Sequence, residues 1–400
     1  MNRKFASRVQ RFIGAMAIGA LLVLGWSHWA PACIGRPVSS DRPGRTMSPL
    51  RALAAAQIEA PTVDTRKPPI PSAAVALDKR LARLGSKFDG ELGIAVRDIQ
   101  TGWTSHYEGL RYFPQQSVSK LWVALTALDR ADRGELALDA PVTVRREDLT
   151  LFHQPIRALA LRQGGFRTTA GDLLIRALTQ SDNSANDRLL QQVGGPDAVR
   201  ATLAGKAISG IRFGPGERVL QSRIAGLDWR PGYAQGGAFY AARDALPAEV
   251  RRDAFDAYTA DPVDGARPLA IVDALARLKQ GKLLSQGATD HMLSMMSHTK
   301  TGPQRLKGGL EPGWTLSHKT GTGQVLDGEQ AGYNDVGILT SPAGRCYAVA
   351  ILIGRTARPL AERMQLMQAV VQATIDYDAR LTAQQAASTD PATPSGVTAG

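Results

Sequence analysis

The sequence predicts an α/β fold of the α+β type, in which an antiparallel sheet formed by both chain ends carries flanking helices and is joined to an all-helical lobe. Two observations lead to this prediction. Short apolar runs bounded by turn residues lie near the beginning and near the end of residues 73–380. The stretch between them instead has helical spacing and helix-capping residues. Strands at both ends with helices between them are typical of a sheet that the chain leaves and later re-enters.

Three apolar runs supply the predicted sheet, and turns such as residues 341–344 (Ser-Pro-Ala-Gly) separate them. The runs are residues 92–96, 335–339 and 347–353. Each is short and rich in β-branched or small apolar residues, which favours neighbouring strands of one sheet. Apolar residues then recur at helical spacing, at Leu360, Met364, Met367, Val371 and Ile375. This stripe predicts a C-terminal helix with one buried face.

The middle of the chain predicts helices. Residues 121–127 are apolar almost all round, which is typical of a helix buried on every side. Thr169 to Asp172 (Thr-Ala-Gly-Asp) form a capping-box pattern that opens a further helix. A cleft between a sheet and a helical lobe is a usual place for a ligand site.

The two ends of the chain differ in character from residues 73–380. Four basic residues precede the apolar run 12–26, and Ala30-Pro31-Ala32 follows it. This layout predicts a signal peptide over residues 1–32 and an exported, periplasmic or secreted protein. An uncleaved anchor and a lipoprotein with Cys33 at its cut remain alternatives. Residues 33–72 and 381–400 lack apolar periodicity and are rich in Pro, Ser, Thr or Ala, so we expect a disordered linker and tail.

The net charge of +12 is concentrated in the ends. Residues 1–51 hold eight basic side chains and one acidic one, a net +7, which leaves +5 for the remainder. A mildly positive globular part suits carboxylated substrates or anionic wall polymers. No basic helix or stacked aromatic pattern points to nucleic acid. No cluster of Cys and His has zinc spacing, so we expect neither a metal nor an organic cofactor.

Three short motifs carry the predicted chemistry. They are Ser-Val-Ser-Lys at 117–120, Ser-Asp-Asn at 181–183 and Lys-Thr-Gly at 319–321. Ser117 and Lys120 lie three apart at the start of the apolar helix, which puts their Cβ atoms roughly 5–6 Å apart on one face. An amine can then reach the hydroxyl, while the helix N-terminus favours the oxyanion that forms when Ser117 attacks a carbonyl. Second copies of two motifs, at 297–300 and 300–302, mean that order and context must decide.

The Ser181 to Asn183 motif lies between two predicted helices. A hydroxyl there can pass a proton to a leaving nitrogen, and the Asn183 amide can hold a substrate amide. The alternative is an ordinary helix cap, because Ser, Asp and Asn all favour that position.

In these motifs and their order, residues 74–378 resemble class A serine β-lactamases, within the penicillin-recognising serine hydrolases. Phe113-Pro114 before the first motif, residues 138–142 (Leu-Asp-Ala-Pro-Val) and Gly313-Trp314 also resemble the connecting sequence of that family. These contexts select the copies at Ser117 and Lys319. The resemblance implies a β-lactamase/transpeptidase-like fold and a Lys319 that opens the strand preceding residues 334–338.

The resemblance also implies a role for each matching residue. Ser117 would be the acylated nucleophile, Lys120 its activating neighbour and Ser181 the proton relay. Asn183 would bind substrate, as would the strand that contains Gly321. On that strand, Lys319 and Thr320 would bind the substrate carboxylate, and the backbone N–H groups of Ser117 and Thr322 would hold the oxyanion. Ammonium and hydroxyl groups suit a carboxylate because both donate hydrogen bonds to it.

The glutamate that would activate the deacylating water is Glu217. Residues 217–221 (Glu-Arg-Val-Leu-Gln) match the family's E-x-x-L-N pattern, except that Gln221 replaces Asn. The Arg and Asp that lock this loop in the family are absent at the expected offsets, where Pro215 and Arg230 stand instead. Glu217 and Lys319 are 102 residues apart, which predicts an insertion near 225–261.

These residues favour an exported, monomeric serine β-lactamase that hydrolyses β-lactam antibiotics through an acyl-enzyme on Ser117, with Glu217-assisted deacylation. Two alternatives remain open. One is a D,D-peptidase or another serine acyl hydrolase that acts on peptidoglycan peptides, for which Glu217 would be incidental. The other is a penicillin-binding module that is acylated and stays so. Phe152, His153 and Arg355 are further candidates for the cleft, against core packing for the first two and a surface position for Arg355.

Overall fold

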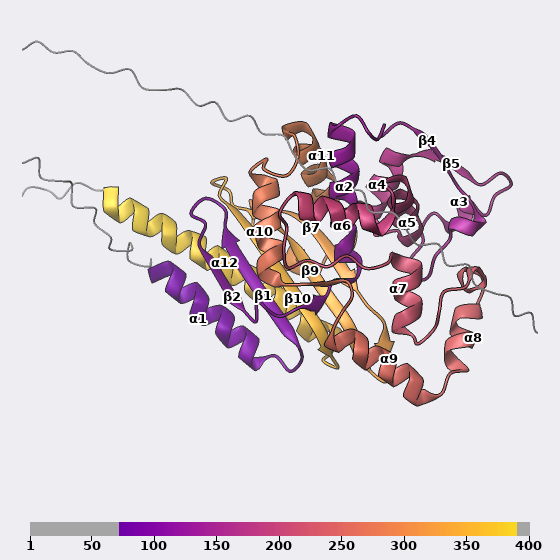
Figure 1. The fold of residues 1–400 in the computed structure, drawn as a ribbon. Helices are drawn as coiled ribbons and strands as arrows, with labels where there is room; N and C mark the ends of the chain where they lie inside the picture. The colour runs from indigo at the N-terminus through magenta and orange to yellow at the C-terminus, as the bar shows by residue number, and fades with distance from the viewer. Residues whose placement is uncertain (1–71, 390–400) are drawn as a thin grey trace, which may run out of the picture. The chain divides into compact units, whose positions relative to one another are not determined.

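A computed structural model describes residues 72–389 of the chain (Figure 1). The predicted signal peptide (1–32), nearly all of the predicted linker (33–72) and the end of the predicted tail lie outside these residues. No helix within the described range is both long and apolar enough to span a membrane.

The main sheet is antiparallel and combines strands from both ends of the described chain. Its order is β2-β1-β10-β9-β7, with β8 paired to β9. The strands are β1 (Leu92–Asp98), β2 (Thr104–Tyr107), β7 (Thr315–Thr322), β8 (Val325–Leu326), β9 (Glu329–Thr340) and β10 (Cys346–Thr356). The three predicted apolar runs lie in β1, β9 and β10, and β10 pairs with both of the others. The sheet prediction is therefore confirmed.

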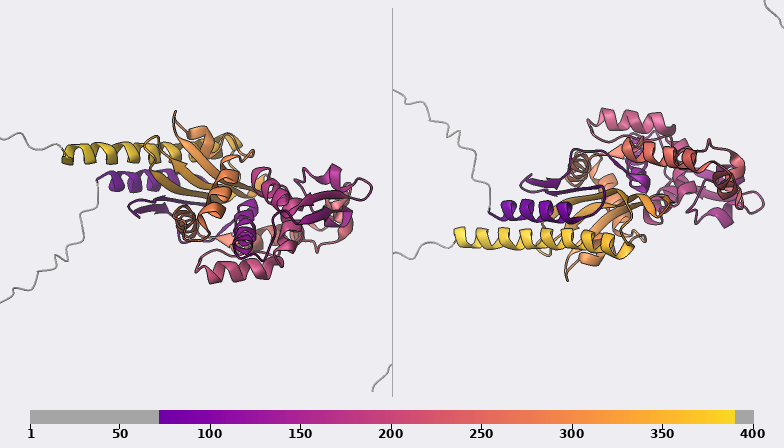
Figure 2. Two further views of the ribbon diagram at one scale, coloured as in Figure 1. Left: turned by 90° about the horizontal axis from the view of Figure 1, so that it is seen from above. Right: turned by 90° about the horizontal axis from the view of Figure 1, so that it is seen from below.

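Both faces of the sheet are covered, so its central strands are apolar on both sides. Val349 and Ile351 of β10 pack toward α1 (Ser72–Lys87) and α12 (Leu360–Thr389), whereas Ala348 and Ala350 belong to the core on the opposite face. Figure 2 shows α1 and α12 side by side in both views. Helix α10 (Pro268–Lys279) covers the other face.

Helix α12 is longer than expected. Of the predicted stripe, Met367, Val371 and Ile375 are buried, Met364 is partly buried and Leu360 is 56% exposed. We had expected residues 381–389 to belong to a disordered tail. The helix continues to Thr389, so these residues are helical. The Ala and Gln residues of this stretch are good helix formers, which accounts for the difference.

The helical lobe surrounds α2 (Lys120–Asp132), whose residues 120–129 are all buried. Fully burying a Leu such as Leu125 contributes about 1.5–3 kcal/mol, so this central position explains why the helix is apolar all round. Helices α4 (Ala170–Thr179), α5 (Asn183–Gln192), α6 (Gly195–Gly205) and α11 (Gln286–Ser297) contact it. The lobe also contains α3 (Arg157–Ala160) and the paired strands β4 (Pro141–Val144) and β5 (Phe166–Thr169).

The predicted capping box at the start of α4 forms only in part. The Thr169 hydroxyl accepts a hydrogen bond from the Asp172 backbone N–H at 3.1 Å, as expected for an N-cap. The Asp172 carboxylate does not return to the Thr169 backbone. It accepts instead from the Thr168 hydroxyl at 2.5 Å and from Arg176 at 2.8 Å, because an Arg one turn later offers a charged donor.

The chain between the two lobes forms α7 (Glu217–Ile224), α8 (Ala238–Asp244) and α9 (Ala248–Ala260), followed by β6 (Gly265–Ala266), which pairs with β3 (Phe113–Pro114). Helices α8, α9 and the short turn at Pro231–Ala234 lie within the segment 225–261.

Strand β7 is the edge of the main sheet beside the helical lobe (Figure 1). The Thr299 hydroxyl donates to the His318 carbonyl oxygen at 2.6 Å, and the Ser317 hydroxyl donates to the Leu293 carbonyl oxygen of α11 at 3.1 Å. Ser317 and His318 thus contact the lobe, and the end of β7 faces the space between sheet and lobe.

Candidate active site

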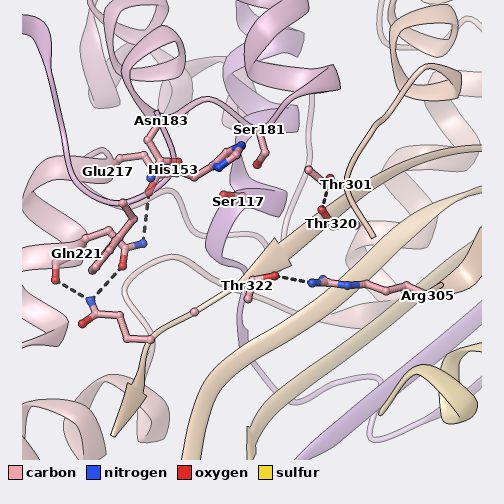
Figure 3. A pocket seen from close by; sticks show the side chains of 13 residues that line it. Ser117, His153, Ser181, Asn183, Glu217, Gln221, Thr301, Arg305, Thr320 and Thr322 are labelled. Carbon is pink, nitrogen blue, oxygen red and sulfur yellow. Dashed lines mark hydrogen bonds between the residues drawn. The ribbon is translucent and has the colours of Figure 1, made fainter. Parts of the chain in front are cut away.

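A pocket of about 370 Å³ lies where the end of β7 faces the helical lobe (Figure 3). Of the predicted site residues, Ser117, Ser181, Asn183, Glu217, Thr320 and Thr322 line it. Lys120, Lys319 and Gly321 are buried directly behind this lining. The structure therefore brings together segments that lie as far apart in the sequence as residues 117 and 322.

Ser117 lies in a short 3-10 turn, Gln116–Ser119, that leads into α2. Gln116 has a φ of 52°, in the left-handed region that residues other than Gly seldom adopt. Lys120 is the first residue of α2, so its side chain and that of Ser117 share one face of the turn. The Lys120 Nζ donates to Ser117 Oγ at 2.7 Å, as the motif spacing predicted.

Lys120 also connects Ser117 to two more of the predicted residues. Its fully buried Nζ donates to Asn183 Oδ1 at 2.9 Å and forms an ion pair with the Glu217 carboxylate. A buried ammonium is stable only when its donors are paired, and these three acceptors pair them. A proton leaving Ser117 can therefore pass through Lys120 to Glu217 without crossing solvent.

The Ser181 to Asn183 motif divides its tasks between capping and the pocket. Asp182 is the N-cap of α5, since its carboxylate accepts from the Ala185 N–H at 2.9 Å and also from the Ile156 N–H at 2.7 Å. The helix-cap alternative thus applies to Asp182 alone. Ser181 has a φ of 59°, and its side chain lines the pocket. Asn183 donates from Nδ2 to the Leu151 carbonyl oxygen in the lobe.

We had expected Lys319 to open its strand. It lies instead at the centre of β7, because four residues of the strand precede it. Its Nζ donates to Ser181 Oγ at 2.8 Å and to the Thr320 carbonyl oxygen at 2.9 Å. Burial, and after it the positive charge of Lys120, hold the pKa of Lys319 well below its ordinary value. The Ser181 hydroxyl therefore sits beside an ammonium that gives up a proton readily.

The other β7 residues are fixed by two side chains that the sequence did not single out for this site. Arg305 donates to the Gly321 carbonyl oxygen at 2.9 Å and to the Thr322 hydroxyl at 2.5 Å. The Thr301 hydroxyl lies 2.6 Å from that of Thr320. Gly321 allows this packing, because a Cβ there would meet the Gln115 carbonyl oxygen at 2.4 Å. Thr301 belongs to the second Lys-Thr-Gly copy, which lies in a loop but still lines the pocket.

Glu217 is the first residue of α7 and only 4% exposed. Its backbone N–H donates to Asp187 Oδ1 at 2.9 Å, while the Arg218 N–H and Nε donate to Asp187 Oδ2 at 3.2 and 3.3 Å. Pro215 and Arg230 stand where the family has the Arg and Asp that hold this loop. Here Asp187 and Arg218 hold the start of α7 instead. Burial, and then the charge of Glu217, raise the pKa of Asp187.

The sequence contained a signal for Asp187 that we did not use. Asp187 follows Asn183 by four residues on α5, so both point toward the same side of the helix. A carboxylate one turn beyond a predicted substrate ligand was therefore a candidate for holding a pocket residue in place.

Gln221, the departure from the family pattern, bridges two parts of the site. Its Nε2 donates to Gln116 Oε1 at 2.9 Å, and its Oε1 accepts from Gln324 Nε2 at 3.1 Å. The same Nε2 donates to Glu217 Oε2 at 3.3 Å (Figure 3). The longer Gln side chain thus reaches the residue that precedes the nucleophile while remaining one helical turn from Glu217.

The three further candidates have different outcomes. Phe152 and His153 line the pocket. Arg355 does not line it, because its guanidinium pairs with Glu329 and Asp256 at 2.5 and 2.8 Å. The surface interpretation is thus the correct one for Arg355. Within residues 72–389, no group of three or more His, Cys, Asp or Glu side chains is arranged to hold a metal ion.

Comparisons with known proteins agree with this geometry. A family model described as the beta-lactamase enzyme family matches residues 76–377. Beta-lactamase VEB-1 of Pseudomonas aeruginosa is 24% identical over 290 residues, 72% of this chain and 86% of the relative. Beta-lactamase L2 of Stenotrophomonas maltophilia is 29% identical over 272 residues, 68% of this chain and 76% of the relative.

Solved structures with the same fold include an ancestral class A β-lactamase and a β-lactamase from Chitinophaga pinensis. The ancestral protein is 27% identical with a TM-score of 0.60, and the comparison covers 75% of this chain and 99% of that one. The second is 26% identical with a TM-score of 0.61, covering 76% and 98%. The predicted fold, a sheet of both chain ends joined to a helical lobe, is confirmed.

Proposed function

The chain belongs to the beta-lactamase enzyme family, with class A enzymes among its relatives, and we propose that it hydrolyses β-lactams through an acyl-enzyme on Ser117. One observation carries the proposal: the Lys120 ammonium contacts Ser117, Asn183 and Glu217 at once. A nucleophile, a lysine that can relay its proton and a carboxylate base thus meet in one buried cluster.

In the acylation step, Ser117 Oγ attacks the lactam carbonyl carbon and its proton passes to the Lys120–Glu217 pair. The C–N bond then breaks, and Ser181 gives its proton to the leaving nitrogen while Lys319 replaces it. The 2.8 Å contact between Lys319 and Ser181 and the lowered pKa of Lys319 support this transfer. The products of this step are an ester on Ser117 and an opened ring.

Before deacylation, the proton that the Lys120–Glu217 pair took up is released and Lys319 regains the proton it lost, so Glu217 is again a carboxylate. Water then attacks the ester carbonyl, Glu217 accepts a proton from that water, and Ser117 leaves with a proton from the cluster. The buried position of Glu217 and its anchoring by Asp187 support this role, because a general base must be held within hydrogen-bond reach of its water. Gln221, one turn along α7, offers a further polar group to that water.

Substrate binding would use the wall of the pocket that β7 forms. We propose that Lys319, Thr320 and Thr322 bind the substrate carboxylate, aided by the close packing at Gly321, and that Asn183 binds the acyl amide. The ammonium of Lys319 and the hydroxyls of the two threonines suit a carboxylate, because all of them donate hydrogen bonds to it. No metal or organic cofactor enters this scheme.

Turnover of a chromogenic cephalosporin, followed by colour and by intact protein mass, tests the proposal. The wild type should hydrolyse the substrate continuously. Glu217→Gln should slow deacylation by about 10²–10⁴-fold and accumulate an adduct, since this is the usual contribution of a general base. Ser117→Ala, the matched control, should form no adduct.

A single burst with a persistent adduct in the wild type would instead favour the non-hydrolysing binding module. Faster cleavage of a peptide ending in D-Ala-D-Ala would favour the peptidase. Full activity in Ser117→Ala would contradict the whole scheme.

The domain organisation and location form part of the same proposal. We propose a monomeric catalytic domain over residues 73–380, with residues 225–261 inserted, that acts after export directed by residues 1–32. Cell fractionation combined with intact mass would check this: a mature protein that lacks these 32 residues is expected outside the cytoplasm, and full-length protein in the cytoplasm would contradict it. Light scattering of the purified protein would check the monomer.

A further inference from the structure

Two buried side chains behind the Ser117 turn have no part in the mechanism above. Asp264, just before β6, is 1% exposed, and Tyr258, on α9, is 6% exposed. Burying a carboxylate is costly unless donors satisfy it. The partners of these two groups therefore indicate what they hold in place.

Asp264 holds the backbone beside the nucleophile. Its Oδ2 accepts from the Gln116 N–H at 2.8 Å, and its own carbonyl oxygen accepts from Gln115 Nε2 at 2.5 Å. Gln116 is the residue with the left-handed φ of 52°, a conformation that persists only where surrounding contacts enforce it. Asp264 supplies one of these contacts directly.

Tyr258 connects Asp264 to the deacylation side of the pocket. Its hydroxyl donates to Asp264 Oδ1 at 3.0 Å and accepts from Gln116 Nε2 at 2.6 Å. Gln116 Oε1 in turn accepts from Gln221, whose Nε2 also donates to Glu217 Oε2. An unbroken chain of hydrogen bonds thus runs from Asp264 to Glu217.

Asp264 determines which group donates and which accepts at each hydrogen bond of this chain. Burial raises the pKa of Asp264 to about 6, so at pH 7.5 it is still a carboxylate and can only accept. Burial, and then Asp264, raise the pKa of Tyr258 well above its ordinary value, so its proton stays in the bond to Asp264. The Tyr258 oxygen must then accept, which makes Gln116 present its NH₂ to Tyr258 and its oxygen to Gln221.

The same logic fixes the next amide. Because Gln116 presents an oxygen, Gln221 must present its NH₂ to both Gln116 and Glu217. A reversed amide would place an oxygen against the Glu217 carboxylate, which repels it. Tyr258 is suited to this task because a single hydroxyl can donate to a carboxylate and accept from an amide at once.

We propose that Tyr258 and Asp264 are positioning residues for deacylation, which fix the orientation of the Gln116 and Gln221 amides and thereby the hydrogen bond on Glu217. The inference rests on the proposed function of Glu217. It also gives the segment 225–261 a role in the reaction, since α9 supplies Tyr258.

Tyr258→Phe tests the proposal, because it removes only the hydroxyl. The ring would keep its packing against Leu220, Ile224 and Phe255. We expect the deacylation rate constant to fall by about ten-fold, as for the loss of one or two buried hydrogen bonds, and the acylation rate constant to change by less than about two-fold. Rapid-quench mass spectrometry with a cephalosporin measures both constants, through the appearance and the loss of the adduct.

Tyr240→Phe is the matched control, since this tyrosine on α8 is 47% exposed, and both constants should keep their wild-type values. Asp264→Asn is a second variant. Its amide can donate to the Tyr258 oxygen and reverse the chain, so it should also slow adduct loss selectively.

Equal falls in both constants, or none in either variant, would overturn the proposal. If the wild type itself kept its adduct, the proposed function would fail. Slow loss of the adduct can still be followed over a longer time in the wild type and in Tyr258→Phe, and equal loss rates would then overturn the inference.

Discussion

The buried carboxyl of Asp264 predicts a specific dependence of stability on pH. Burial raises its pKa in the folded protein from an ordinary 3.8 to about 6, against the opposing effect of hydrogen bonds from the Gln116 N–H and Tyr258. A group whose pKa is raised by folding stabilises the fold fully below its unfolded value, and this stabilisation is lost as pH rises through the folded value. The free energy of unfolding should therefore fall between about pH 4 and pH 6.

The magnitude follows from the two pKa values. They differ by about 2.2, and a ten-fold change in proton affinity is worth about 1.4 kcal/mol, so the full loss is about 3 kcal/mol. About 2 kcal/mol of it falls between pH 4 and pH 7, since part of the unfolded-state carboxyl is already ionised at pH 4.

Asp264→Asn isolates this effect, because its amide does not titrate and other groups cancel in the comparison. Urea unfolding of both proteins at a series of pH values gives the difference in free energy of unfolding. Relative to the wild type, Asp264→Asn should gain about 2 kcal/mol on going from pH 4 to pH 7. A difference that stays constant over this range, or changes in the opposite direction, would refute the reasoning.

Two further predictions concern the site and the lobe. Asp187→Asn should slow deacylation by about 10–100-fold, because its amide keeps only one acceptor oxygen in place of the two that bind the Glu217 and Arg218 backbones. Asp197→Asn, at an exposed site, is the control, and unchanged adduct loss in Asp187→Asn would show that Asp187 does not hold Glu217 in place. Thr169→Ala should lower the free energy of unfolding by about 1 kcal/mol through loss of the N-cap, as measured in urea, and an unaltered midpoint would show that this cap is not needed.

The sheet could be predicted from the sequence because its central strands are buried on both faces. Runs such as residues 347–353 are then apolar at every position, which makes them visible. The short edge strands β2 and β8 carry no comparable signal. The extent of α12 was misjudged because Ala, Gln and Thr also occur in disordered tails, and composition alone does not separate the two.

The motif residues of the site could be predicted because their order along the chain is specific. Ser117 and Ser181 line one pocket, and Lys319 lies behind the lining with a hydrogen bond to Ser181. Arg305 could not be placed from patterns in the same way, since its role arises from contacts between segments that are far apart in sequence. A single arginine in a loop has no distinguishing neighbours until the chain is folded, whereas Asp187 could have been found from its position one helical turn after Asn183.

The edge position of β7 has a consequence for folding and solubility. An unpaired strand edge is a template on which any extended chain can form backbone hydrogen bonds, including another copy of the same protein. Here the lobe contacts the first half of the strand through Leu293 and Thr299, and Arg305 binds one carbonyl oxygen of the second half, that of Gly321. The half that ends at Thr322 has to stay open to admit a ligand. Molecules in which the lobe has not yet docked would expose the whole edge, so timely docking of α11 guards the protein against self-association while it folds.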